Sequence, residues 1–417
     1  MQRMEKHTQT MAGHWLKLLV CSLMMMNTQV RGSNDVEFTF LESAVSKGAV
    51  CLNGSPPAYS YVKGYGEGAS NWVVFLEGGG WCHSKRNCQY RAKSMMGSSL
   101  TRGNKTAFSG LLYKDKLFNP DFYNWNKVFI VYCDGSSFMS DIEEVDPETN
   151  VTYRGARIFN AVMEDLLAKG MKDAKNAVLA GTSAGGLATI LHCDYFRGLI
   201  PNASRVKCIS DSGFFIHAKN LPGAKQREDY YANIVATHRL ANFLPASCSS
   251  KMNASLCLFP ENLVGDIQTP LFILESAFDS FQIDHNYMTL AFNSTPEWNE
   301  CNTNLTRCTS TQIQNIKDFR VAFIETLQKL DNRTSSRGMF VHSCYLHGHI
   351  FMNEEWSCSS VVGHNVLENK TIAKAIGDWY FDRSSFQHID TTNDVPRNCT
   401  STLTSEELCK ECIHQLN

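Results

Sequence analysis

The chain of 417 residues has a formal net charge of -2, and 43% of its residues are hydrophobic. This composition is typical of a globular protein with a sizeable core, and it lacks the basic excess of a nucleic-acid-binding protein. Its 16 cysteines are far more than a cytosolic protein ordinarily carries, which indicates an oxidising compartment.

The first 32 residues have the pattern of a targeting segment. Arg3 and Lys6 precede an apolar stretch at residues 15–26, and polar residues follow it. The stretch is too short to span a bilayer, so we expect residues 1–32 to be a signal peptide. Residues 33–417 then form a single domain of a secreted protein.

Patterns of buried strands alternate with helical patterns along most of the chain. Helical patterns include residues 156–169 and 318–330. The alternation predicts an α/β fold, in which helices flank a mostly parallel central sheet. The segment 217–266 is too long for a loop, so we expect a cap-like insertion there. The predicted strands are residues 72–76, 128–132, 177–180, 206–210, 271–275 and 339–341.

A run of three glycines follows the first of these strands, in the sequence Glu77-Gly78-Gly79-Gly80-Trp81. Successive glycines leave backbone N–H groups free to face a ligand, as in an oxyanion hole. A flexible turn is the alternative. Because the run lies between a buried strand and a Trp-Cys pair, we favour backbone donors, with Gly80, Trp81 and the later Ala184 as candidates.

A serine flanked by small residues follows the strand at 177–180, in the sequence Gly181-Thr182-Ser183-Ala184-Gly185. A helical pattern comes next. This order of strand, sharp turn and helix is the context in which G-x-S-x-G indicates a nucleophile elbow. An ordinary turn is the alternative, since glycine and serine are common in loops. We interpret Ser183 as a candidate nucleophile.

Candidate acid and base residues follow two later strands. Asp279 comes shortly after residues 271–275, and His347 comes shortly after residues 339–341. Open α/β sheets bind ligands at the carboxyl ends of their strands, so both residues are placed for catalysis. His347 is a modest favourite on position alone, and His349 is the second choice. Further candidates are Asp134 and Asp284 for the acid, and His342 and His364 for the base.

Several longer blocks resemble one known family. They are residues 119–126 (NPDFYNWN), 132–138 (YCDGSSF), 153–157 (YRGAR), 181–194 (GTSAGGLATILHCD) and 210–215 (SDSGFF). The chain is similar over about residues 36–386 to the plant pectin acetylesterases, whose animal sister branch is the Notum-type carboxylesterases. The resemblance implies an α/β-hydrolase fold and a serine esterase without a cofactor.

The family's catalytic residues correspond to particular positions of this chain. Its nucleophile corresponds to Ser183 and its acid to Asp279, and its histidine three residues after a cysteine corresponds to His347. Its oxyanion donors correspond to Gly80, Trp81 and Ala184. Two departures are visible: Thr182 stands where plant members usually have Cys, and Gly348-His349 stands where they more often have Cys-Gln.

The resemblance also implies a substrate, namely acetylated pectin (homogalacturonan) in the plant cell wall. A Notum-like enzyme, which removes a fatty acyl group from a secreted protein, is one alternative. A catalytically silent hydrolase fold that binds wall polysaccharide is another.

Close spacing of cysteines suggests some disulfide pairs as hypotheses: Cys82–Cys88, Cys248–Cys257, Cys301–Cys308 and Cys344–Cys358. The resemblance suggests Cys51–Cys133. Removing Cys21 with the signal leaves an odd number, and we expect Cys193 to be the free, buried thiol. Cys409, Cys412 and His414 have metal-like spacing, but in such a chain we expect disulfides and no metal site.

Ten Asn-x-Ser/Thr sites support the secretory route and predict surface glycans. They lie at Asn53, Asn104, Asn150, Asn202, Asn253, Asn293, Asn304, Asn332, Asn369 and Asn398.

Overall fold

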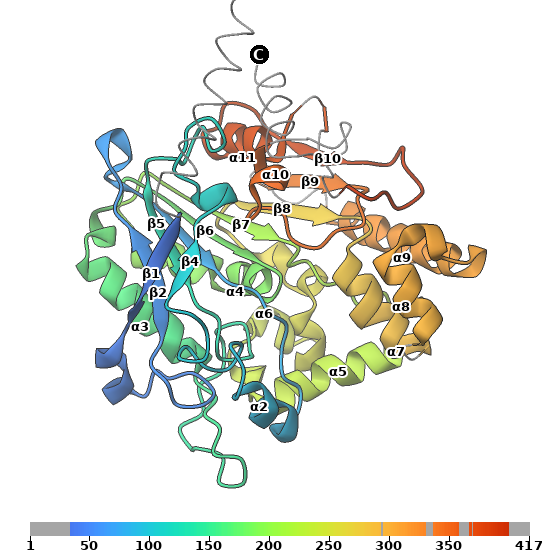
Figure 1. Ribbon diagram of the computed structural model, residues 1–417, viewed down its shortest axis with the longest axis horizontal. Helices are drawn as coiled ribbons and strands as arrows, with labels where there is room; N and C mark the ends of the chain where they lie inside the picture. The colour runs from blue at the N-terminus through green and yellow to red at the C-terminus, as the bar shows by residue number, and fades with distance from the viewer. Residues whose placement is uncertain (1–33, 293–294, 331–336, 358–366, 369, 400–417) are drawn as a thin grey trace, which may run out of the picture.

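The computed structural model describes residues 34–292, 295–330, 337–357, 367–368 and 370–399. Its centre is a ten-stranded sheet in the order β10-β9-β8-β7-β6-β3-β5-β2-β1-β4 (Figure 1). The seven strands from β10 to β5 in this order are parallel, whereas β2, β1 and β4 are joined by antiparallel pairings. The predicted α/β fold with a mostly parallel sheet is confirmed.

The predicted strands all appear, with ends that differ by at most a few residues. Strand β10 at one edge of the sheet and strands β2, β1 and β4 at the other end of it were not predicted. The strands are β1 (Asp35–Phe40), β2 (Ala58–Val62), β3 (Asn71–Leu76), β4 (Lys105–Ala107), β5 (Asn126–Ile130), β6 (Asn176–Thr182), β7 (Arg205–Asp211), β8 (Leu271–Ser276), β9 (Gly338–His342) and β10 (Gln387–Ile389).

The helices connect successive strands and cover the sheet. They are α2 (Lys85–Arg91), α3 (Gly155–Ala168), α4 (Ala184–Leu199), α5 (Ala224–Thr237), α6 (Ala246–Ser249), α7 (Thr289–Phe292), α8 (Pro296–Thr303), α9 (Ser310–Gln328), α10 (Asn353–Ser357) and α11 (Ile372–Tyr380). Among the described residues, no helix has the length and apolar character needed to cross a bilayer.

The sheet has an apolar core on each face, which explains why its central strands are hydrophobic throughout. Trp72 and Val74 of β3 pack in a core with residues of α3 and α4, whereas Val73 and Phe75 pack in a second core with residues of α10 and α11. Successive side chains of a strand point to opposite faces, so both must be apolar when helices cover both. Figure 1 shows α3 and α4 on one side of the sheet and α10 and α11 on the other.

Two long connections lie at the carboxyl ends of the strands. The one between β7 and β8 contains α5, α6 and several 3-10 turns, and the one between β8 and β9 contains α7, α8 and α9. In Figure 1, α5, α7, α8 and α9 gather at one side of the molecule. That residues 217–266 act as a cap stays a prediction.

Six disulfides join the described cysteines. Four predicted pairs are confirmed: Cys51–Cys133, Cys82–Cys88, Cys248–Cys257 and Cys301–Cys308. Two predictions were wrong. Cys193 is not free, because α4 packs on β7 and places it against Cys208, and Cys344 bonds to Cys399 rather than Cys358. Cys21, Cys358, Cys409 and Cys412 lie outside the described residues.

Candidate active site

Ser183 lies at the turn between β6 and α4, with φ 59° and ψ -124°. A non-glycine residue at this positive φ is strained, and such strain concentrates at functional sites. The flanking glycines are required by close contacts. A Cβ on Gly181 would lie 2.3 Å from the Gly185 carbonyl oxygen, and one on Gly185 would lie 2.2 Å from the Leu76 oxygen. The sequence therefore forms the predicted sharp elbow.

The glycine run after β3 lies directly against this elbow. A Cβ on Gly78 would come within 2.8 Å of the Ser183 Cβ. The Tyr132 hydroxyl donates to the Gly80 carbonyl over 2.8 Å, and the Arg91 guanidinium donates to the Gly79 carbonyl over 2.8 Å. These bonds hold the carbonyl oxygens of the run.

The candidate oxyanion donors have free main-chain N–H groups. Within the part of the chain that the structure describes, the N–H groups of Gly80, Trp81 and Ala184 donate no hydrogen bond. Ser137 connects the two segments, because its Oγ accepts from the Trp81 indole over 2.8 Å and donates to the Ala184 carbonyl over 2.7 Å. Ala184 also begins α4, whose positive dipole end favours a developing negative charge.

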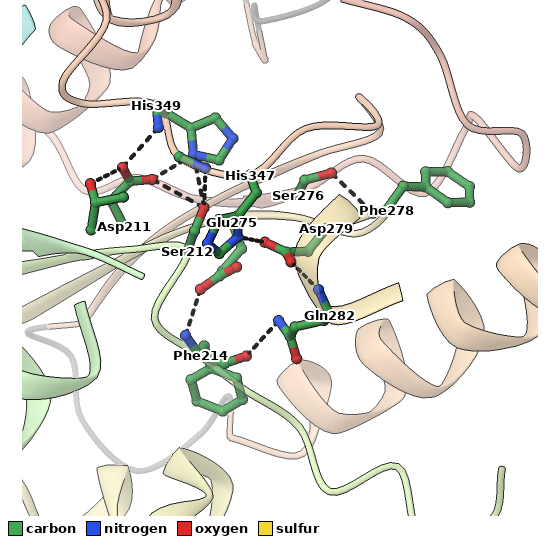
Figure 2. Close-up of polar contacts among 12 residues, drawn as sticks. Asp211, Ser212, Phe214, Glu275, Ser276, Phe278, Asp279, Gln282, His347 and His349 are labelled. Carbon is green, nitrogen blue, oxygen red and sulfur yellow. Dashed lines mark hydrogen bonds and ion pairs between the residues drawn. The ribbon is translucent and has the colours of Figure 1, made fainter. Parts of the chain in front are cut away.

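Asp279 and His347 form a pair beyond the ends of β8 and β9 (Figure 2). Asp279 Oδ2 lies 2.7 Å from His347 Nδ1, and its Oδ1 accepts the Gln282 N–H over 2.8 Å. The Asp279 side chain is fully buried, and that of His347 is 17% exposed. His347 Nε2 is buried and has no hydrogen-bond partner among the described residues. This nitrogen is therefore available to a hydroxyl group.

The loop that carries His347 also touches the elbow. Gly348 adopts φ +88°, and a Cβ there would lie 3.2 Å from the Thr182 Cγ2 atom. Phe281 stacks on the His347 ring at 5.0 Å and 26°. The structure thus brings the predicted nucleophile, acid, base and oxyanion segments to one end of the sheet.

The competing acid and base candidates have other partners. Asp284 accepts from the Trp298 indole, and Asp134 accepts from Ser136 and Phe138. His349 is buried between Asp211 and His342. His364 lies outside the described residues.

Two buried carboxylates here had no role in the sequence interpretation. Asp211 ends β7, and Glu275 is in β8. Both carry the signal used for Asp279, an acidic residue at the carboxyl end of a predicted strand. Asp211 even lies within the block at residues 210–215 that carries the family resemblance, but nothing in the sequence indicated its partners.

The environments of these two carboxylates differ. Burial raises the pKa of Glu275 well above its usual 4.5, and nearby Asp279 raises it further. Burial also opposes ionisation of Asp211, but His349 and the hydrogen bonds that Asp211 accepts outweigh it and lower its pKa. Conversely, burial lowers the pKa of His349, but Asp211 outweighs it and raises that pKa above 6.5.

A pocket of about 1020 Å³ extends from His347. Its lining includes Phe281, Asp284, Asn302 and Tyr345. One cluster with metal-like spacing occurs among the described residues, formed by Cys82, Cys88 and His238, but a disulfide joins its two sulfurs. Disulfide sulfurs do not offer the thiolates that bind metals. Cys409, Cys412 and His414 lie outside the described residues.

The chain is 45% identical to pectin acetylesterase 11 of Arabidopsis thaliana over 388 residues, which cover 93% of this chain and 97% of that one. It is 31% identical to a palmitoleoyl-protein carboxylesterase (notum1') of Xenopus laevis, over 58% of this chain and 52% of that one. The solved structure of the Wnt deacylase Notum from Drosophila has a similar fold, with a TM-score of 0.70 at 22% identity, covering 87% of this chain and 97% of that chain.

The fold and these relatives define a carboxylic ester hydrolase with an α/β-hydrolase architecture. The family model for pectinacetylesterases matches residues 30–402. The chain belongs to the pectinacetylesterase family, as its sequence resemblance predicted.

Proposed function

We propose that the protein is a secreted serine esterase that removes acetyl groups from pectin in the plant cell wall. In this proposal Ser183 is the nucleophile, His347 the general base, and Asp279 the acid that orients it. The observation that carries the proposal is the Asp279–His347 pair at 2.7 Å, in which the buried outer ring nitrogen is unpartnered among the described residues. The pectin acetylesterase names of the Arabidopsis relatives support the substrate.

The chemistry follows from these roles. His347 Nε2 accepts the Ser183 proton as Oγ attacks the acetyl carbonyl, while Asp279 stabilises the imidazolium that forms. The N–H groups of Gly80, Trp81 and Ala184 bind the developing oxyanion; losing one such donor ordinarily costs about 3 to 4 kcal/mol. The imidazolium then protonates the departing sugar oxygen. Water attacks the acyl-enzyme with His347 again as base, and acetate leaves.

Aromatic packing beside the elbow supports a short acyl group. Trp81 contacts Phe215 edge-on, with 4.8 Å between ring centroids, and Tyr231 at 5.7 Å. All three side chains are buried, and the Phe215 ring lies 6.5 Å from that of His347. These rings fill the space on their side of the base, which leaves less room there for a long acyl chain.

The cysteines support a secreted protein. Twelve of them form disulfides in the described residues, and such bonds persist in oxidising compartments. The predicted signal peptide at residues 1–32 and the predicted glycans agree with this route.

Acetate release from acetylated pectin tests the proposal, with Ser183→Ala as the inactive variant. Ser99→Ala is the matched control, because Ser99 is also buried and, within the described structure, its Oγ donates only to the Pro56 carbonyl. We expect release by the wild type and the control, and none from Ser183→Ala. Equal release by Ser183→Ala would refute the nucleophile. A preference for nitrophenyl octanoate over acetate, without release from pectin, would instead favour the Notum-like alternative.

A further inference from the structure

A second Asp–His pair lies beside the proposed catalytic pair. His349 Nδ1 is 2.5 Å from Asp211 Oδ1, and both side chains are fully buried. Unlike His347, His349 has no free ring nitrogen, because its Nε2 lies 2.8 Å from His342 Nε2. In Figure 2, His349 and Asp211 lie on the opposite side of His347 from Asp279. The second pair cannot reach a substrate, so its contribution must act through other residues.

Asp211 contacts the nucleophile elbow through two atoms. Its main-chain oxygen accepts the Ser183 N–H over 2.9 Å, and its Oδ2 accepts the Thr182 hydroxyl over 2.6 Å. The strained φ of Ser183 persists only if surrounding bonds hold it. These two bonds fix Ser183 and the preceding Thr182.

The same carboxylate holds the loop after His347. Asp211 Oδ2 also accepts the main-chain N–H groups of His349 over 2.8 Å and Ile350 over 3.1 Å. The neighbouring Ser212 hydroxyl accepts the Gly348 N–H over 2.8 Å. One end of β7 therefore connects the segment before the nucleophile with the segment after the base.

The hydrogen bonds of the two buried rings have one consistent direction when both are neutral. The Cys344 N–H donates to His342 Nδ1 over 3.1 Å, so the proton of His342 is on Nε2. That proton is donated to His349 Nε2, which leaves the proton of His349 on Nδ1, facing Asp211. Burial lowers the pKa of His342 well below 6.5, which keeps this ring neutral. Cys344 is itself held by its disulfide to Cys399.

We propose that Asp211 and His349 are positioning residues, which fix the distance and orientation of His347 relative to Ser183. The proposal rests on the catalytic roles proposed above. Catalysis by a base requires the reacting atoms to be held within a fraction of an ångström, and a 1 Å misplacement costs about 100-fold in rate. Loss of the pair should therefore lower kcat and leave KM for a small ester nearly unchanged.

The experiment compares His349→Leu, His349→Asn and Asp211→Asn on nitrophenyl acetate, together with the rate at which a fluorophosphonate labels Ser183. Leucine fills the site without a donor, whereas the asparagine amide can reach Asp211 from the position of Nδ1. We expect His349→Leu and Asp211→Asn to lower kcat by about 100-fold with KM within about threefold. His349→Asn should recover at least about tenfold relative to His349→Leu, and labelling should follow kcat.

Tyr380→Phe is the control for lost stability. The Tyr380 hydroxyl contacts the carbonyls of Ala177 and Arg205, which lie at the amino ends of β6 and β7, whereas the site lies at the carboxyl ends. This variant therefore removes a buried hydrogen bond away from the site. If folded His349→Leu keeps the kcat of this control, or if His349→Asn is no better than His349→Leu, the proposal is wrong. Should His349→Leu fail to fold, His349→Asn must exceed Asp211→Asn by at least about tenfold, or the proposal fails. Equal activity of wild type and Ser183→Ala would refute the catalytic assignment instead.

Discussion

Replacing Asp279 by Asn tests the proposed triad most directly, because its surroundings dictate how the asparagine must point. Asp279 Oδ1 accepts the Gln282 N–H, and Oδ2 faces His347 Nδ1. An asparagine keeps the Gln282 bond only by placing its carbonyl oxygen there, which turns its NH2 group toward His347. The ring must then carry its proton on Nε2, and it cannot accept the Ser183 proton.

The size of the loss follows from two terms. Turning the amide over would leave the buried Gln282 N–H unsatisfied, at a cost of about 1 to 3 kcal/mol. The missing negative charge no longer stabilises the imidazolium, and two unit charges about 4 Å apart attract by about 4 kcal/mol at an effective dielectric constant of 20. Each 1.36 kcal/mol is a factor of ten in rate, so Asp279→Asn should lower kcat about 10⁴-fold.

The assay is the kcat for nitrophenyl acetate, measured beside the thermal unfolding midpoint. Asp378→Asn is the control, since Asp378 is a buried aspartate in α11, on the face of the sheet opposite α4. It should retain wild-type kcat. An Asp279→Asn variant that folds normally and keeps more than about a tenth of wild-type activity would refute the role of Asp279.

Three other predictions concern acyl size, pH and a disulfide. Phe215→Val should raise the ratio of nitrophenyl octanoate to nitrophenyl acetate hydrolysis by at least about tenfold, because each methylene group that the site newly accommodates contributes about 1 kcal/mol or more. An unchanged ratio would contradict the inference that the aromatic rings limit acyl length. Glu275→Gln keeps an acceptor for the Phe214 N–H and removes a carboxyl whose pKa is raised on folding. In the wild type, the contribution of this carboxyl to the unfolding free energy is fully present below pH 4.5 and is lost as the pH rises toward the folded pKa. Relative to the wild type, the variant should therefore become more stable by up to about 1.4 kcal/mol per pH unit over that window. Parallel stability curves of the two proteins from pH 4 to 8 would contradict this. Replacing both Cys193 and Cys208 by Ala opens a bond with a sequence separation of 15 and should lower the unfolding free energy by about 3 kcal/mol; a peptide map in which Cys193 carries a free thiol would contradict the pairing.

The local pattern of apolar and small residues predicted the central strands and the elbow, because both depend on residues that are close together in the sequence. The run at β3 is apolar on both faces, and the small residues around Ser183 are required by contacts within a few ångströms. Asp279 and His347 followed from a topological rule, since parallel strands bring their carboxyl ends to the same edge. Their pairing at 2.7 Å agrees with that rule, and their catalytic roles stay predictions.

Features that depend on distant pairing were not predictable in this way. Strand β2 pairs antiparallel with β5, across 60 or more residues that give no local signal. Cys193 was assigned as free from its place on the helix after Ser183, yet α4 packs on β7 and carries it to Cys208. The bonds of Asp211 to the loop after β9 likewise depend on the order of strands in the sheet.

Three carboxyl groups lie close together at this edge, and their partners decide which of them is charged. Asp211 faces His349 and accepts several N–H and O–H donors, which lower its pKa. Glu275 Oε1 accepts the Phe214 N–H, whereas its Oε2 is buried without a partner in the described structure, and its pKa is raised. A protonated Glu275 adds no second negative charge beside Asp279. Of the three carboxyl groups, Asp279 is the one that contacts His347, whereas Asp211 contacts His349.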